Sequence, residues 1–140
     1  MKKTTLLIIL VTFIFGCSKD RFNNDNPFLP NYNFSIDLNT NFPIYASLKF
    51  SGNAVKAFPA NGPSRGVIVF NNGSGFNAFD GACPNQALTT CSTLNISGSN
   101  ANCPCNSENY NLFTGQSPGQ QYELKRYRVE VNGDVVRVFN

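Results

Sequence analysis

The residues of this 140-residue chain with the widest chemical scope are its cysteines, four of which lie close together in the second half. Two short segments, which we call hook 1 (Cys83–Asn85) and hook 2 (Cys103–Asn106), each begin with cysteine and end with asparagine. Thiolates are soft ligands for iron, zinc and copper, and thiols oxidise to disulfides outside the reducing cytosol. The hooks therefore predict either a metal site or a site closed by disulfides.

Most catalytic chemistry is excluded by composition. The chain contains no histidine, so a histidine-based triad or imidazole acid–base pair cannot form. The acidic residues are scattered, and Gly73-Ser74-Gly75 lies in a predicted hairpin rather than at the start of a helix, which excludes a phosphate-binding loop. We expect a protein that is not an enzyme and has no catalytic residues.

The elements that must position the hooks are β-strands. Gly, Pro, Asn, Ser and Thr interrupt the chain every few residues, and no window shows helical periodicity. Val67–Phe70 is continuously apolar, so both of its faces should be covered, and Asn132-Gly133 between β-branched runs is a strong hairpin signal. We predict an all-β domain with strands at Phe34–Leu38, Tyr45–Phe50, Val55–Phe58, Val67–Phe70, Phe76–Phe79, Val129–Val131 and Asp134–Val138.

The N-terminus has the features of an export signal. Lys2 and Lys3 precede an apolar run at Leu6–Phe15 that is too short to span a bilayer comfortably. The run ends in Gly16-Cys17, which resembles the lipobox of bacterial lipoproteins, in which the cysteine carries the lipid. We therefore expect a signal peptide at residues 1–16 and lipid attachment at Cys17.

Residues 17–30 are rich in Asn and Pro, and are predicted to be a polar tether to one domain over residues 31–140. Ser18-Lys19-Asp20 resembles tags that send some Gram-negative lipoproteins to the outer surface. The expected location is the bacterial envelope, with attachment to the outer membrane through the N-terminal lipid and surface display as an option.

Nucleic acid is not expected as a partner. Without residues 1–16 the chain has nine basic and eight acidic side chains, and phosphate binding needs clustered positive charge. The only local cluster is Lys125, Arg126 and Arg128, within a predicted strand. Alternation places Arg126 and Arg128 on one face, which we interpret as a solvated strand surface.

The order of motifs from Gly66 to Phe139 resembles the Rieske iron–sulfur domain family. Rieske domains typically show an apolar strand, AFD, a first cysteine hook, a second cysteine hook, an aromatic residue with TG, a Pro/Gly loop and a closing hairpin. Here the corresponding segments are Val67–Phe70, Ala78-Phe79-Asp80, hook 1, hook 2, Tyr110–Gly115, Ser117-Pro118-Gly119 and Tyr127–Phe139. The resemblance implies a Rieske-like domain of small antiparallel sheets with both hook loops at one tip.

The same resemblance places Cys83 and Cys103 at the two cysteine ligands of a Rieske [2Fe-2S] cluster, and Asn85 and Asn106 at the two histidine ligands. Asparagine cannot replace imidazole, because a neutral carboxamide is a weak oxygen donor whose nitrogen lone pair is delocalised. We therefore expect a degenerate site without a cofactor or metal, and a cluster with non-standard ligands as the alternative.

Cys91 and Cys105 add two further thiols near the hooks. The four cysteines lack the paired Cys-x-x-Cys spacing that is usual for a zinc or all-thiolate iron–sulfur site. No predicted helix N-terminus or neighbouring cation would lower a thiol pKa, so a redox role is not favoured. Two disulfides are the expectation for four cysteines in an exported domain. Direct pairing of Cys103 with Cys105 is strained, which leaves two connectivities. The family resemblance favours Cys83 with Cys103 and Cys91 with Cys105.

Two functions remain. The favoured one is a binding or structural module, whose loop tip meets an unknown envelope protein or surface ligand. The resemblance to the redox-partner docking tip of Rieske proteins places this surface at Pro84, Asn85, Asn106, Ser107 and Ser117-Pro118-Gly119. The alternative is a Rieske-type electron-transfer protein that still binds [2Fe-2S].

Overall fold

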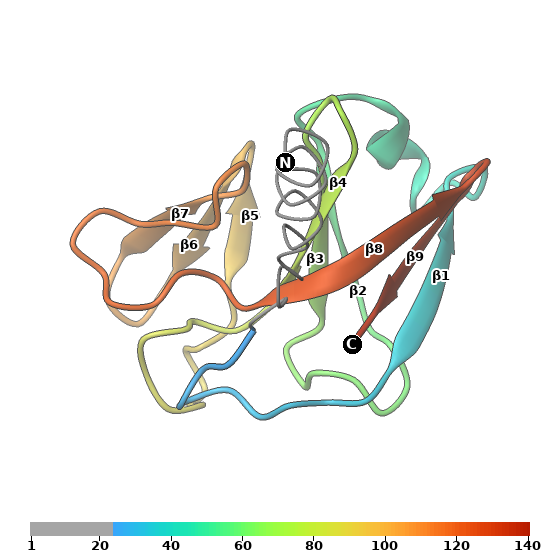
Figure 1. Ribbon diagram of the computed structural model, residues 1–140. Helices are drawn as coiled ribbons and strands as arrows, with labels where there is room; N and C mark the ends of the chain where they lie inside the picture. Colours follow the sequence, from blue (N-terminus) through green and yellow to red (C-terminus); the bar gives the residue numbers. More distant parts are fainter. Residues whose placement is uncertain (1–23) are drawn as a thin grey trace, which may run out of the picture.

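The computed structural model describes residues 24–140, which form an almost entirely β-structure (Figure 1). This part of the chain contains one short 3₁₀ helix, η1 (Ala46–Lys49), and nine strands. The strands are β1 (Ser35–Asn39), β2 (Ala54–Ala57), β3 (Val67–Asn71), β4 (Phe76–Asp80), β5 (Asn95–Ser97), β6 (Asn100–Cys103), β7 (Glu108–Asn111), β8 (Arg126–Asn132) and β9 (Val135–Phe139).

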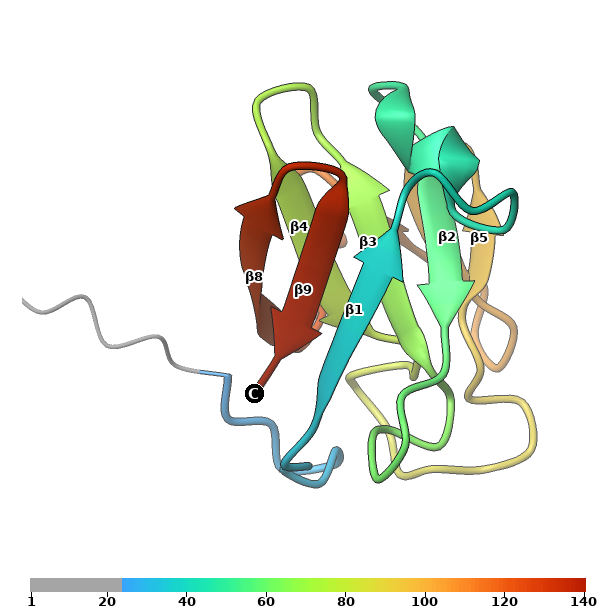
Figure 2. The same cartoon turned by 90° about the vertical axis from the view of Figure 1, so that its right-hand side faces the viewer.

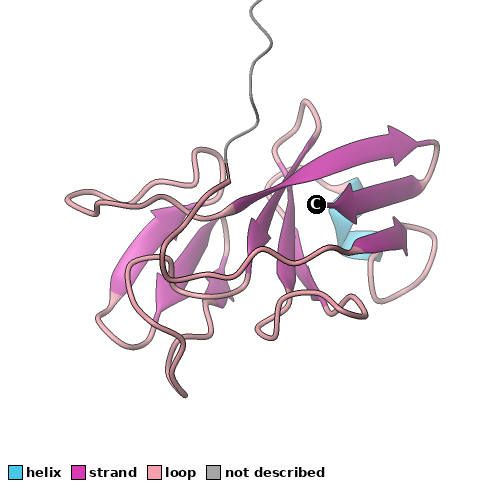
Figure 3. Ribbon diagram, turned by 60° about the horizontal axis from the view of Figure 1, so that its bottom comes forward, coloured by secondary structure: helices cyan, strands magenta, loops and turns pink. Residues whose placement is uncertain are grey.

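The strands form two antiparallel sheets. The larger sheet has the order β1-β9-β8-β4-β3-β2, and the smaller one has the order β5-β6-β7. Figure 2 shows the strands of the larger sheet curving around one another, and Figure 3 shows the smaller sheet to one side, surrounded by loops. The predicted all-β fold of small antiparallel sheets is confirmed.

Strand β3 separates two hydrophobic cores because its side chains alternate between its faces. Val67 and Val69 belong to the first core, inside the larger sheet, together with Leu38 of β1. Ile68 and Phe70 belong to the second core, which includes residues of the smaller sheet and the first cysteine of each hook, Cys83 and Cys103. The side chains of Val67–Phe70 are fully buried, and Asn71 at the end of β3 is half-buried. The expectation that both faces of this strand are covered is confirmed.

Both predicted hairpins are present. β3 pairs with β4, and the Asn71 side chain accepts a 2.8 Å hydrogen bond from the Gly73 amide in the turn, where Gly73 has a φ of 90°. β8 pairs with β9 through a turn that begins at the Asn132–Val135 pair, and Gly133 has a φ of 59°. Glycine adopts these positive φ values without a steric penalty, which fixes the register of each hairpin.

The predicted strand at Tyr45–Phe50 is wrong, because this segment forms η1. Its amides bond three residues back, with Leu48 to the Tyr45 carbonyl at 3.0 Å and Phe50 to the Ser47 carbonyl at 3.1 Å. Leu48 is fully buried, whereas Phe50 is 67% exposed. A single buried anchor suits one tight helical turn, whereas a half-buried strand would bury alternate side chains.

Lys125 of the basic cluster is only 3% exposed, whereas Arg128, on the strand face interpreted as solvated, is exposed and Arg126 is half-buried. Its Nζ donates to the Leu29 carbonyl at 3.2 Å and to Asn31 Oδ1 at 2.5 Å. Burial lowers the pKa of Lys125, and the neighbouring Asp80 carboxylate opposes that shift. The aliphatic stem of Lys125 is thus packed inside, and its ammonium group fastens the segment before β1.

The segment before β1 contacts the domain from Asn24 onward, including residues predicted to belong to the tether. The Asn24 side chain donates to the Arg126 carbonyl at 3.2 Å, and the Asn26 side chain donates to the Pro84 carbonyl at 2.9 Å. Leu29 is buried. The predicted signal peptide and Cys17 lie outside the described residues. Within residues 24–140, no helix has the length and hydropathy needed to cross a membrane.

Candidate functional site

Two disulfides bring the hooks together at the end of the smaller sheet. Cys83 follows β4 and bonds to Cys103, the last residue of β6, with their Cα atoms 5.7 Å apart. Cys91 bonds to Cys105, with Cα atoms 5.2 Å apart. Both separations are typical of disulfides. The connectivity is the one favoured by the family resemblance, and it places all four cysteines in one site.

Asn85, at the first histidine-equivalent position, fastens two loops together. Its Nδ2 donates to the Tyr110 hydroxyl at 2.8 Å and to the Tyr122 carbonyl at 2.7 Å. Its Oδ1 accepts from the Tyr122 amide at 2.9 Å. Donor and acceptor of this carboxamide are therefore both used within the protein, and the side chain acts as a latch between hook 1 and the loop before β8.

Asn106, at the second histidine-equivalent position, is exposed and lies in the turn between β6 and β7. Its Oδ1 accepts from the Glu108 amide at 3.4 Å, and its Nδ2 lies 3.5 Å from Gln86 Oε1. The next residue, Ser107, has a φ of 61°, and its amide donates to the Cys103 carbonyl at 2.9 Å. Asn106 thus shapes an exposed turn, in contrast to the half-buried latch made by Asn85.

Tyr110 connects the latch to the smaller sheet. Its hydroxyl donates to Glu108 Oε2 at 2.6 Å and accepts from Asn85 Nδ2. Burial, followed by the hydrogen bond to the Glu108 carboxylate, raises the pKa of Tyr110 well above its usual value. The phenol therefore stays neutral at ordinary pH and keeps its donor role.

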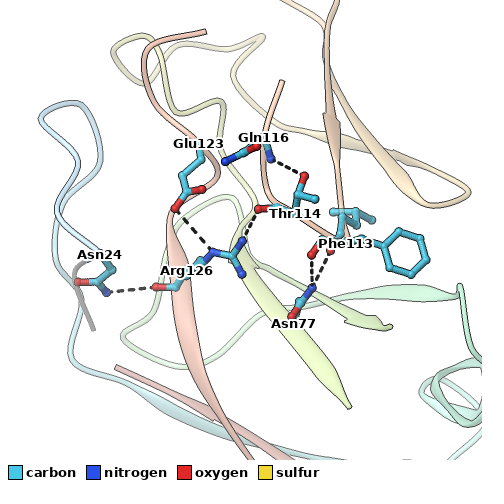
Figure 4. A network of polar contacts seen from close by, with 8 residues as sticks. Asn24, Asn77, Phe113, Thr114, Gln116, Glu123 and Arg126 are labelled. Carbon is cyan, nitrogen blue, oxygen red and sulfur yellow. Dashed lines mark hydrogen bonds and ion pairs between the residues drawn. The ribbon is translucent and has the colours of Figure 1, made fainter. Parts of the chain in front are cut away.

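The Pro/Gly loop is the third part of the predicted tip. Arg126 and Asn77 contact the chain segments on either side of this loop (Figure 4). Arg126 donates to the Thr114 carbonyl, lies 3.7 Å from Glu123 Oε1 and sits 5.1 Å above the Phe79 ring centroid. Asn77 Nδ2 donates to the Leu112 and Phe113 carbonyls at 2.9 and 3.1 Å. The base of the loop at Ser117-Pro118-Gly119 is therefore attached to β4 and β8.

Three sulfur atoms at the tip form a compact group. The Sγ atoms of Cys83, Cys103 and Cys105 lie within 4.8 Å of one another. If the disulfides were reduced, these three cysteines would be the tip residues best placed to hold a metal. Gln86 Nε2 donates to Cys105 Sγ at 2.6 Å. Sequence patterns contain no signal for Gln86 or Glu108, because neither lies in a hook and their contacts depend on loop geometry.

The chain matches no protein-family model and no curated protein. Its structure aligns at a TM-score of 0.50 and 12% identity with a chain in the reduced complex between oxygenase and ferredoxin in carbazole 1,9a-dioxygenase, covering 77% of this chain and 28% of that one. The fold is therefore Rieske-like, as the motif order implies.

Two further solved structures are also similar. One is a chain in a complex of reduced oxygenase and oxidized ferredoxin in carbazole 1,9a-dioxygenase, with a TM-score of 0.48, 17% identity, and coverage of 81% of this chain and 94% of that one. The other is a ferredoxin of Sphingomonas yanoikuyae, with a TM-score of 0.47, 18% identity, and coverage of 65% and 88%.

Proposed function

We propose that this protein is a lipid-anchored envelope protein whose Rieske-like domain has lost its metal site and acts as a binding module rather than as an enzyme. The bond between Cys83 and Cys103 is the observation that carries this proposal. A metal binds a thiolate. These two sulfurs lie at the positions of the cysteine ligands in Rieske domains, but they are bonded to each other and are therefore not thiolates.

The asparagines support the same conclusion. The Asn85 amide donates to Tyr110 and Tyr122 and its carbonyl accepts from Tyr122, so an iron would have to compete with these hydrogen bonds for the side chain. Asn106 offers only a neutral carboxamide, which is a poor substitute for imidazole. The residues present therefore do not fit a Rieske [2Fe-2S] cluster.

The first test measures the cofactor and the thiols in one sample. Protein expressed and purified anaerobically is assayed for iron, acid-labile sulfide and visible absorption, with a Rieske ferredoxin as the positive control. The denatured protein is then alkylated with and without prior reduction. We expect colourless protein without iron, in which the four tip cysteines react only after reduction. Stoichiometric iron and sulfide with visible absorption would overturn the proposal.

The contacts of residues 24–29 also orient the tip relative to the proposed anchor. Six residues lie between Cys17 and Asn24, so the seven steps from one Cα atom to the next reach at most about 25 Å. Asn26 is hydrogen bonded to Pro84 of hook 1. A lipid on Cys17 would therefore hold the tip close to the membrane surface, where its partner would be a protein attached to the same membrane.

The second test examines this orientation. A photo-crosslinking residue at exposed Ser107 in the tip should give a discrete adduct in intact envelopes, whereas the same residue at exposed Asn132, on the distant β8–β9 turn, should not. Cys17→Ser should abolish palmitate labelling, membrane fractionation and the adduct together. Membrane attachment that survives Cys17→Ser would contradict the anchor, and equal crosslinking at both positions would contradict the binding tip.

A further inference from the structure

The sulfur cluster at the tip has an exposed end and a buried end. Cys91 is exposed, and its partner Cys105 is half-buried. Cys83 and Cys103 are fully buried. The Sγ of Cys105 is nevertheless within 4.8 Å of both buried sulfurs. A thiol from solution can therefore reach Cys91 directly, whereas the nearest thiol available to the buried disulfide is that of Cys105.

We propose that the two disulfides form a thiol–disulfide relay, which accepts a dithiol at Cys91 and passes the exchange through Cys105 to Cys83. This role requires both disulfides but does not depend on the proposed binding function of the tip. It adds a reactive site to a tip that is otherwise proposed to bind a partner.

The first step reduces the exposed disulfide. A thiolate of the dithiol attacks Cys91 Sγ, the Cys91–Cys105 bond breaks, and Cys105 leaves with the electron pair as a thiolate. The second thiol of the reagent then resolves the mixed disulfide, releasing Cys91 as a thiolate and the reagent as its own disulfide. Two electrons have moved from the dithiol to the protein, and the reagent's two protons pass to solvent or to the new thiolates.

Hydrogen bonding favours Cys105 as the leaving sulfur. Gln86 Nε2 donates to Cys105 Sγ at 2.6 Å, whereas the Thr89 hydroxyl lies near both sulfurs, 3.3 Å from Cys91 Sγ and 3.7 Å from Cys105 Sγ, so the preference for Cys105 comes from Gln86. Donors directed at sulfur stabilise the thiolate, which makes it both a better leaving group and the form that attacks disulfides. Gln86 is itself held in place by the Ser92 hydroxyl at 3.1 Å.

In the second step, the free Cys105 thiolate exchanges with the buried Cys83–Cys103 disulfide, and the protein gains or loses no electrons. Cys105 Sγ attacks Cys83 Sγ, a Cys83–Cys105 bond forms, and Cys103 leaves as a thiolate. Attack on Cys103 instead would join two cysteines separated only by Pro104, which is an unfavourable geometry for a disulfide. The product is a rearranged disulfide with a free thiol at the buried position.

A matched pair of variants tests the relay. Cys91→Ser leaves Cys105 as the free thiol, and Cys105→Ser leaves Cys91, while both retain Cys83 and Cys103 for folding. Each protein is held at mildly alkaline pH without reductant, quenched with acid and alkylated. Chymotryptic peptides are then mapped by tandem mass spectrometry. For Cys91→Ser we expect alkylation divided between Cys105 and Cys103, with a Cys83–Cys105 disulfide present. For Cys105→Ser we expect alkylation at Cys91 alone.

Reduction kinetics provide a second measurement. With dithiothreitol as the dithiol and no denaturant, the Cys83–Cys103 bond should be lost at least about tenfold faster in Cys91→Ser than in Cys105→Ser. The wild-type protein should lose the Cys91–Cys105 bond before the buried one. Alkylation of Cys91→Ser at Cys105 only, or equal rates in the two variants, would overturn the relay. If Cys91→Ser does not accumulate, Cys103 labelling of the wild-type protein under limiting dithiothreitol decides the question in the same way.

Discussion

The larger sheet and the tip of the smaller sheet are stabilised in different ways. The larger sheet includes strands of up to seven residues, and alternate side chains fill its core. The strands of the smaller sheet have three or four residues, and both disulfides and the Asn85 latch lie beside them. Short strands bury little apolar area, so cross-links and side-chain hydrogen bonds supply the order that packing supplies elsewhere.

Leu38→Ala should show the dependence of the larger sheet on packing, and we expect it to have the largest effect of any single substitution. Leu38 is fully buried in the first core, and removing its side chain should lower the free energy of unfolding by about 2–5 kcal/mol. Urea unfolding with the disulfides intact measures this. Val131→Ala, at a position 55% exposed on the same sheet, should change it by less than about 0.5 kcal/mol. Equally small losses of stability for Leu38→Ala and Val131→Ala would contradict the view that the larger sheet depends on packing.

Replacing Cys83 and Cys103 together by alanine should show the dependence of the tip on cross-links. Closing a loop with a sequence separation of 20 residues is worth about 3 kcal/mol of unfolding free energy. The matched double variant removes the Cys91–Cys105 disulfide, which closes a comparable loop with a separation of 14 but lies nearer the surface. The buried pair also packs in the second core, so its loss should cost more. Urea unfolding that ranks the two variants in the opposite order would contradict this assignment.

Asn85→Ala and Asn106→Ala should differ in their effect on the free energy of unfolding, because Asn85 is a half-buried latch and Asn106 lies in an exposed turn. The Asn85→Ala substitution leaves the Tyr122 amide and carbonyl without this partner, while the Tyr110 hydroxyl keeps its bond to Glu108, and should cost about 1–3 kcal/mol. Asn106→Ala removes the equivalent side chain from hook 2, where it is exposed, and should cost less than about 0.5 kcal/mol. Thermal unfolding of both variants provides the comparison, and similar losses would mean that the two asparagines have similar roles.

This contrast also explains what could be predicted from the sequence. The larger sheet is encoded in local patterns, since the apolar run at Val67–Phe70 and the Asn132-Gly133 turn depend only on neighbouring residues. The motif order of the Rieske family supplied the cysteine pairing. The partners of Gln86 and Tyr110, and the burial of Lys125, depend on loops that meet only in the folded chain. No periodicity records such contacts, so these roles could not be predicted.

The smallest predicted effect lies at the exposed edge of the larger sheet, where Arg137 Nε donates to Asp37 Oδ1 at 2.7 Å between β9 and β1. This hydrogen bond lowers the pKa of Asp37 below its ordinary value of 3.8. Since the folded protein binds this proton less tightly than the unfolded chain, the stabilisation is present above that value and is lost as pH falls through the lower folded pKa. Asp37→Asn should therefore reduce thermal stability slightly at neutral pH and not at strongly acidic pH. Molar salt should shrink the difference, because both side chains are about half exposed and such pairs are screened. A large loss that is independent of salt would show that the edge of the larger sheet, like the tip, depends on a specific polar contact.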